Sequence, residues 1–332
     1  MNSVSRCGYF ALVGALLGIA STAHGGEKSP EARAIAFLAA EVPKWHAEKH
    51  CHSCHNSGDA ARALMWAADA GLLPDKSPLA ETLEYLSEPA TWDADGPDGP
   101  FKDRQLARIQ FAAALAEAHG AGVLDHRDAL AQAAALVAEL QSPEGFWDTD
   151  MPGTLGSPVT YGRALATALA QRVLRATGDE QYDDAILKAQ GWFETTEAKS
   201  VLDAAATMLA LAPYRNQEAQ ARREQCLRLI RQGQSPDGGW GPFANSAPEA
   251  FDTALVVLAL SIESQRPQQG KPDEARREVL QQIQRGRAYL VAAQEADGGW
   301  PPTTRPPGVD SYAQRLSTTG WATQALLATR GK

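Results

Sequence analysis

One loop occurs three times in this sequence, as Gln141-Ser-Pro-Glu-Gly-Phe-Trp147, as Gln234-Ser-Pro-Asp-Gly-Gly-Trp240 and as Gln294-Glu-Ala-Asp-Gly-Gly-Trp300. In each copy the Gln precedes the Trp by six positions, and an acid-Gly turn lies between them. A charged amphipathic segment precedes each loop and a segment of small, apolar residues follows it. A repeated unit of this kind predicts a stack of helix pairs.

The loops serve as landmarks for counting helix pairs along the rest of the chain. The first helices of the pairs are expected near 31–48, 77–88, 125–141, 180–194, 217–233 and 273–294. The second helices are expected near 58–70, 103–118, 159–176, 199–212, 248–263 and 314–329. The composition agrees with a helical chain, because 61 Ala stand against 20 Val plus Ile and Ala is the best helix former.

The two helices of a pair differ in character. First helices carry charge on one face, as in Arg222-Arg223-Glu224, whereas second helices are apolar or small nearly all round, as in Ala254-Leu-Val-Val-Leu-Ala-Leu260. A helix that is apolar on every side must be buried. We therefore expect an all-α fold in which the second helices form an inner layer, the first helices form an outer layer, and six pairs close into a ring.

The three loops resemble the glutamine–tryptophan repeats of the squalene cyclase and protein prenyltransferase superfamily. The repeat motifs match well over 125–330. Over 31–120 the resemblance depends only on the regular spacing of the expected helices. It implies an α/α toroid of about six helix pairs in one domain, 26–332. It also implies a structural role for the repeat motif, in which Gln and Trp tie one helix end to the next (Gln141, Trp147, Gln234, Trp240, Gln294 and Trp300).

The chemistry of that superfamily is harder to locate. Squalene-type cyclases protonate their substrate with an Asp-x-Asp-Asp motif, and the nearest match is Asp93-Ala-Asp95-Gly96, which lacks the last acid. The zinc-binding Asp-x-Cys pair of the prenyltransferases is also missing, because Glu224 stands two before Cys226. Three acids could face the interior, namely Asp203, Asp252 and Asp310, although Asp at the start of a helix is usually a capping residue.

The first 25 residues have the pattern of a secretory signal peptide. Arg6 precedes an apolar run of 13 residues, Gly8 to Ala20, and small residues follow near Ala23. Such a run is too short to span a bilayer, and no later segment is long enough. We expect an exported, periplasmic protein without a transmembrane segment. Its net charge of −9 argues against nucleic acid as a partner.

A second motif stands in the first repeat, at 45–58, in place of the Gln-to-Trp loop. It contains Cys51-x-x-Cys54-His55, which is the sequence of c-type haem attachment. In that chemistry the two thiols bond covalently to the haem, and the histidine ligates its iron. The motif predicts one covalent haem c on Cys51 and Cys54, with His55 as axial ligand.

Two alternatives compete with haem at this motif. Cys51 and Cys54 could form a plain disulfide, or they could bind zinc together with two of the four neighbouring histidines, His46, His50, His52 and His55. Zinc usually needs a second ligand pair at a distance. For the sixth iron ligand of a haem, Met65 on the following helix is a weak candidate, since Met is more often a core residue; His119, His126, Met151 and Met208 lie in other units.

The preferred function from sequence is an exported c-type haem protein on a toroid scaffold, active in electron transfer with an unknown redox partner. Two other classes stay open. One is an enzyme of the toroid superfamily, similar to a terpenoid cyclase or a prenyltransferase, with an apolar substrate in the centre of the ring. The other is a module that binds a protein partner without catalysis.

Overall fold

The computed structural model describes residues 28–93, 104–266, 273–303, 305 and 311–331, and every regular element in these ranges is helical. The outer helices are α1 (Pro30–Lys49), α3 (Ala80–Leu86), α5 (Arg127–Ala138), α7 (Asp183–Thr195), α9 (Gln217–Gly233) and α11 (Asp273–Ala293). The inner helices are α2 (Ala61–Asp69), α4 (Arg104–Gly120), α6 (Gly162–Thr177), α8 (Val201–Leu211), α10 (Ala250–Ser264) and α12 (Tyr312–Ala328). A π-helical segment, η1 (Cys54–Ala60), leads directly into α2.

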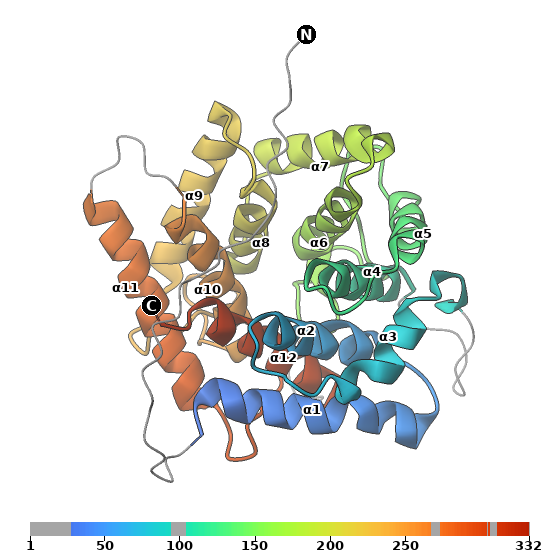
Figure 1. Ribbon diagram of the computed structural model, residues 1–332. Coiled ribbons are helices and arrows are strands. Elements are labelled where there is room, and N and C mark those ends of the chain that lie inside the picture. The colour runs from blue at the N-terminus through green and yellow to red at the C-terminus, as the bar shows by residue number, and fades with distance from the viewer. Residues whose placement is uncertain (1–27, 94–103, 267–272, 304, 306–310, 332) are drawn as a thin grey trace.

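The predicted fold class is confirmed: the helices form two concentric layers around a common centre (Figure 1). Three short 3₁₀ segments, Ser77–Leu79, Pro89–Thr91 and Glu180–Tyr182, complete the outer layer. The apolar inner helices are buried as expected. On α10, for example, Leu255, Val256 and Val257 are each inaccessible to solvent. On the outer helix α9, only one face is buried.

The ring closes because the last helix packs against the first unit. Helix α12 contacts η1, α2 and α1, just as α10 contacts α8 and α12 within the ring (Figure 1). On the described residues, no helix combines the length and the apolar character that crossing a membrane requires. Residues 1–25, where a signal peptide is predicted, lie outside the described residues.

Each repeat glutamine joins two successive outer helices. Its side-chain Nε2 donates to the carbonyl of the turn glycine in its own loop and to a carbonyl on the next outer helix. The second bond runs from Gln141 to Ala185 (2.8 Å), from Gln234 to Gln282 (3.1 Å), and from Gln294 to Pro30 (2.9 Å). The Gln294 bond links the last outer helix to the first, so the ring closes through the same joint that connects α5 to α7 and α9 to α11.

Each repeat tryptophan fixes the loop between its own outer and inner helices. The indole Nε1 of Trp147, Trp240 and Trp300 donates to a carbonyl of the preceding outer segment at 2.7–2.8 Å. The backbone N–H of each Trp donates to a threonine on the inner helix that follows, namely Thr167, Thr253 and Thr319. All three indoles are fully buried, so each contributes a large apolar area as well as two bonds.

The turn glycine of the closing joint has a steric role. Gly298 has φ +98°, a conformation that L side chains rarely adopt, and a Cβ there would collide with the carbonyl of Arg33 on α1. The same Arg33 donates through Nη2 to Gln294 Oε1 at 2.6 Å. Glycine therefore supplies both the backbone conformation and the close approach that let the last loop meet the first helix.

Candidate active site

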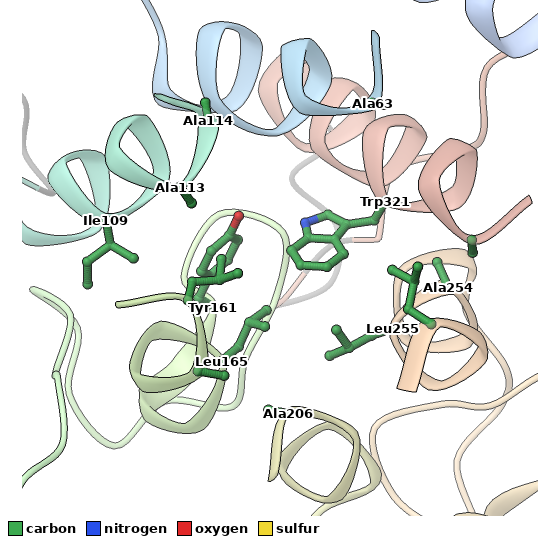
Figure 2. Packing of buried hydrophobic residues seen from close by; sticks show 14 of the residues in the cluster. Ala63, Ile109, Ala113, Ala114, Tyr161, Leu165, Ala206, Ala254, Leu255 and Trp321 are labelled. Atoms are coloured by element: carbon green, nitrogen blue, oxygen red, sulfur yellow. The ribbon is translucent and has the colours of Figure 1, made fainter. Parts of the chain in front are cut away.

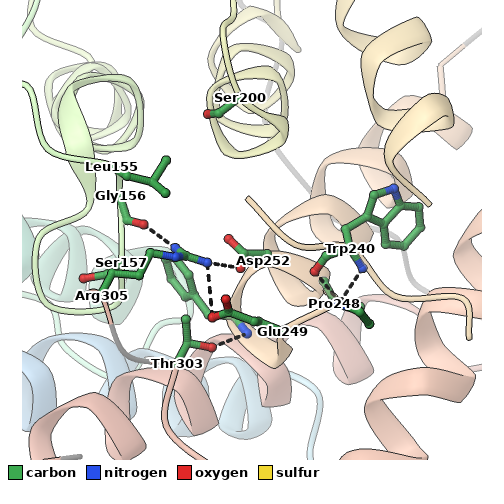
Figure 3. Close-up of polar contacts among 12 residues, drawn as sticks. Leu155, Gly156, Ser157, Ser200, Trp240, Pro248, Glu249, Asp252, Thr303 and Arg305 are labelled. Atoms are coloured by element: carbon green, nitrogen blue, oxygen red, sulfur yellow. Dashed lines mark hydrogen bonds and ion pairs between the residues drawn. The ribbon is translucent and has the colours of Figure 1, made fainter. Parts of the chain in front are cut away.

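A buried carboxyl group lies at the start of inner helix α10. Asp252 is in the first turn of α10 and is inaccessible to solvent. Its Oδ2 accepts a hydrogen bond from the guanidinium of Arg305, while its Oδ1 has no hydrogen-bond partner among the described residues (Figure 3). An unpartnered buried oxygen is costly, so this arrangement calls for a functional explanation.

The electrostatics of this group favour its protonated form. Burial raises the pKa of Asp252 to about 8, although the Arg305 guanidinium beside it acts in the opposite direction. Asp252 therefore holds a proton at neutral pH. If that proton leaves, Arg305 is already in place to stabilise the carboxylate, and a carboxylic acid of this kind is suited to general acid catalysis.

Arg305 is itself held from three sides. It donates to the carbonyl of Gly156 in the loop before α6, it pairs with Glu249 at 3.3 Å, and it pairs with Asp252 (Figure 3). The guanidinium thus connects the loop before α6 to the N-terminal end of α10. Because Arg stays charged at all physiological pH values, this positive charge beside Asp252 is permanent.

Three buried aromatic rings pack against one another, and one of them, Phe251, adjoins the acid in the chain. Phe251 and Tyr161 each lie with their ring centroids 6.0 Å from that of Trp321, in edge-on arrangements. All three side chains are at most 2% exposed. Tyr161 and Trp321 point toward the middle of the ring together with Leu165 and Leu255 (Figure 2). Aromatic faces attract positive charge, so this wall suits a cationic species in an apolar setting.

A second buried carboxyl group lies close to Tyr161 and Trp321. Asp59, in η1, is inaccessible to solvent. It accepts hydrogen bonds from the Tyr161 hydroxyl and from Gln110 Nε2 at 2.9 Å, and it pairs with Arg62 at 3.3 Å. Burial raises the pKa of Asp59, and the nearby Arg62 charge opposes that rise.

Tyr161 reaches Asp59 through a strained backbone. It is the residue just before α6, and its φ of 56° lies in the left-handed region that non-glycine residues seldom adopt. Such strain costs about 1–3 kcal/mol and collects at functional sites. Arg62, in turn, lies 4.7 Å from the centroid of the Trp321 ring and donates to Gln324 at 3.1 Å, so the cluster connects α2, α6 and α12.

Of the three acids that could face the interior, Asp252 is the one that the structure buries, in the first turn of α10. Asp203 is a capping residue: it forms a reciprocal capping box with Ser200 at the start of α8. Asp310 lies outside the described residues. Asp93 of the partial Asp-x-Asp-Asp match pairs with Arg108, while Asp95 lies outside the described residues.

The Cys51-x-x-Cys54-His55 segment is packed into the wall of the first unit. His52 is sandwiched between His46 and Tyr85, with ring centroids 4.5 and 3.9 Å away. The His55 Nδ1 lies 3.2 Å from the Ser317 hydroxyl of α12. Cys51 and Cys54 form no disulfide, and Cys54 is buried at the start of η1. The segment therefore fills a joint between α1, α3 and α12.

The remaining predicted ligands are scattered over the fold. Met65 is fully buried in α2, and Met208 is buried in α8, whereas Met151 is half exposed on a loop. Cys226 is buried on the outer helix α9, and burial raises the pKa of its thiol to about 12. These residues occupy core or surface positions in different units and do not gather around one point.

Sequence reasoning missed Asp59, Arg62, Gln110, Tyr161 and Arg305. Two of them left a readable signal: Asp59 and Arg62 are opposite charges three residues apart in an inner helix that is otherwise small and apolar. Charges in such a helix are buried only as pairs. Tyr161 and Arg305 left no signal, because both act from irregular segments whose position depends on the closed ring.

Two curated relatives resemble part of this chain. The drimenyl diphosphate synthase of Streptomyces showdoensis is 30% identical over 187 residues, which is 53% of this chain and 32% of the relative. The drimenyl diphosphate synthase of Streptantibioticus cattleyicolor is 28% identical over 191 residues, 54% of this chain and 33% of the relative. This chain thus spans about a third of the length of the curated relatives it matches. No protein-family profile matches it.

Solved structures share the fold over nearly their whole length. The type II terpene cyclase MstE from Scytonema, without ligand, is similar with a TM-score of 0.56 at 14% identity, over 90% of this chain and 97% of MstE. A variant of MstE in complex with geranylgeranyl dihydroxybenzoate, its substrate, gives a TM-score of 0.54 at 13% identity, with the same coverage. A protein from Actinoplanes gives 0.53 at 13% identity.

These findings correct the preferred sequence interpretation. Its haem c on Cys51, Cys54 and His55, its electron-transfer function and its cytochrome-like and iron-binding character were wrong, because the relatives in sequence and the neighbours in structure are terpene cyclases. The zinc alternative was wrong as well. Across the described ranges, no three His, Cys, Asp or Glu side chains are grouped so that they could hold a metal ion. The toroid-enzyme alternative is the one that the comparisons favour.

Proposed function

We propose that this chain is a terpene cyclase that begins its reaction by protonating a double bond of a linear prenyl chain. The observation that carries the proposal is the Asp252–Arg305 pair: a buried acid whose pKa is raised to about 8, with one oxygen that has no hydrogen-bond partner among the described residues. The drimenyl diphosphate synthases and MstE support the same class of reaction.

In this mechanism Asp252 is the general acid. An alkene is a very weak base, so the donor must not lose its proton to a better acceptor. The Asp252 Oδ1, which has no partner among the described residues, meets that requirement. When the proton moves to the terminal double bond, the negative charge left on Asp252 is stabilised by the preformed Arg305 contact, which needs no reorganisation.

The aromatic wall then stabilises the carbocation. Phe251 is the neighbour of the acid in the chain, and Trp321 and Tyr161 extend the wall across the interior. A cation near these rings gains about 0.5–2 kcal/mol from each face. The surrounding helices contribute Ala and Leu, such as Ala206 and Leu255 (Figure 2), which exclude water that would otherwise quench the cation.

The comparisons support a prenyl substrate and leave its polar end open. The substrate of MstE carries a geranylgeranyl group on dihydroxybenzoate, whereas the product named for the sequence relatives carries a diphosphate. What these compounds share is the isoprenoid part. The near-complete coverage of MstE by this one ring supports the view that a single toroid is large enough for the reaction.

The acid departs from the motif that squalene-type cyclases use. The residues Glu249-Ala-Phe-Asp252 have acids at the first and last positions of Asp-x-Asp-Asp, and Phe251 stands at the third. The protonating role therefore falls on the last position in this proposal. Glu249 pairs with Arg305 and helps to hold the guanidinium against Asp252.

The experiment compares two matched variants with the unmodified chain. The protein is incubated with farnesyl diphosphate, the products are treated with phosphatase, and cyclised terpenes are identified by gas chromatography and mass spectrometry. Asp252→Asn is expected to lower product formation at least about a hundredfold. Asp203→Asn, the same change at the corresponding capping position of α8, should leave product formation within about twofold. Equal effects of the two changes, or no cyclised product from the unmodified chain, would overturn the proposal.

A further inference from the structure

We infer that Tyr161, hydrogen-bonded to the buried carboxylate of Asp59, is the base that ends the reaction by removing a proton from the final carbocation. This inference deepens the proposed function and depends on it. A reaction that begins with proton transfer to the substrate can return to a neutral alkene only if a base takes a proton from a carbon beside the cation, so the interior needs a second group that Asp252 does not supply.

The geometry places a base where this step needs one. The Tyr161 hydroxyl donates to Asp59, and its ring lies edge-on to Trp321, which also contacts Phe251, the neighbour of the acid in the chain. Asp59 and Asp252 are separate groups, held by different arginines, Arg62 and Arg305. Figure 2 shows the Tyr161 and Trp321 side chains facing each other in the ring interior.

The proton balance of the step is complete. The C–H bond beside the cation breaks, and its electron pair becomes the new double bond. The proton passes to the Tyr161 oxygen, whose own proton moves along the existing hydrogen bond to Asp59. The cation and the Asp59 carboxylate are both neutralised, and Tyr161 is unchanged. Asp252 has lost one proton and Asp59 has gained one, so exchange with water after product release resets both.

The surroundings of the pair fit this role. Burial holds the pKa of the Tyr161 phenol well above its usual range, so Tyr161 relays a proton and does not become a stable phenolate. Burial raises the pKa of Asp59, whereas the Arg62 charge and the hydrogen bond from Tyr161 act in the opposite direction and favour the carboxylate that can accept a proton. Arg62 and Gln110 hold the carboxylate from its other sides, and the strained backbone of Tyr161 fixes the direction of the hydroxyl.

The first test reads the product mixture. Tyr161→Phe keeps the ring and removes the relay. With farnesyl diphosphate, the variant should still form cyclic products, while the share of cyclic alkene falls about tenfold or more and cyclic alcohol, formed when water traps the cation, replaces it. Tyr182→Phe, at a buried tyrosine of the outer layer, should change neither share. An unchanged alkene share in Tyr161→Phe, with its folding confirmed by circular dichroism, would overturn the inference.

The second test does not depend on turnover. The probes are an N-alkyl decahydroquinolinium, a bicyclic ammonium that imitates a cyclised cation, and the neutral alkyl decalinol of similar size. We expect the unmodified chain to bind the ammonium about tenfold more tightly, which is about 1.4 kcal/mol. Asp59→Asn should abolish the preference, and Asp252→Asn should keep it.

The outcomes separate this inference from the function on which it depends. If the unmodified chain forms cyclised products but shows no ammonium preference, or if Asp59→Asn retains the preference, the inference fails and the proposed function stands. If the chain neither binds the two probes nor converts farnesyl diphosphate, the proposed function fails and the inference fails with it.

Discussion

At the scale of single residues, two buried carboxyl groups have different roles because their surroundings differ. One carboxyl oxygen of Asp252 contacts the Arg305 guanidinium, and the other has no hydrogen-bond partner in the described part of the chain. Asp252 is therefore arranged to donate a proton. Asp59 is bound by Arg62, Gln110 and Tyr161, so it is arranged to accept one. The same chemical group performs opposite functions because its hydrogen bonds and neighbouring charges differ.

The pH dependence of the reaction should follow Asp252. Its pKa is about 8, and only the protonated form can start the reaction. The initial rate should therefore be level between about pH 6.5 and 7.5 and should fall about tenfold per unit well above pH 8. A rate that keeps rising from pH 7 to pH 9 would contradict this role of Asp252.

Arg305 should affect the rate more than the stability. Arg305→Met removes the charge that stabilises the Asp252 carboxylate formed in the first step, and losing such a group typically costs about 10²–10³ in rate. Arg305→Lys should recover part of that loss, because it restores the charge without the planar contact to Gly156. Steady-state kinetics and thermal melting of the two variants distinguish this expectation from a purely structural role, in which activity and stability would fall together.

At the scale of elements, the joints between helices were readable from sequence because they use local chemistry. The six-residue spacing from Gln to Trp predicted the three loops, and the structure shows a shared set of bonds in each, including Gln294 to Pro30 across the closure. The function of the Cys51-x-x-Cys54-His55 element was predicted wrongly because its surroundings are not local in the sequence. Its residues match a short motif, and only the folded ring shows that His52 stacks on Tyr85 and that His55 faces Ser317.

The closing joint should contribute measurable stability. Gln294→Ala removes the bonds to Pro30 and Gly298 and leaves their carbonyls unpaired, which should lower the free energy of unfolding by about 1–3 kcal/mol. Gln141→Ala breaks the equivalent joint inside the ring and should cost a similar amount. Urea unfolding of the two variants checks this. A loss at Gln141 with none at Gln294 would mean that the closure contributes nothing in solution.

The His52–His55 segment should make the protein sensitive to acid. Burial lowers the pKa of both His52 and His55 to about 4, below the usual 6.5 that applies when the chain is unfolded. Between these values the unfolded chain binds more protons, so the unfolding free energy should fall as the pH drops from 6.5 to 4. His55→Asn should show a smaller fall over this range than the unmodified chain. Parallel pH profiles for both proteins would rule out a contribution from His55.

At the scale of the whole molecule, the sequence predicted the architecture well and the active site poorly, for one physical reason. A closed ring of helix pairs is encoded in each repeat separately, through apolar inner helices and Gly-Trp loops, so the fold can be read unit by unit. The site is formed by residues from different units. Asp252 and Arg305 come from different units, as do Tyr161 and Asp59. These pairs come into contact only in the folded ring, so no local spacing in the sequence predicts them.

The most direct test of the central claim is to run the reaction in heavy water. If Asp252 starts the reaction by donating its exchangeable proton, every cyclised molecule formed from farnesyl diphosphate in D₂O should carry one added deuterium, at the carbon that was the terminal alkene. Mass spectrometry should show a shift of one mass unit, lost together with the product in Asp252→Asn. Cyclised product without deuterium would show that the reaction does not begin with a proton from the protein. The proposed role of Asp252 as general acid would then be wrong.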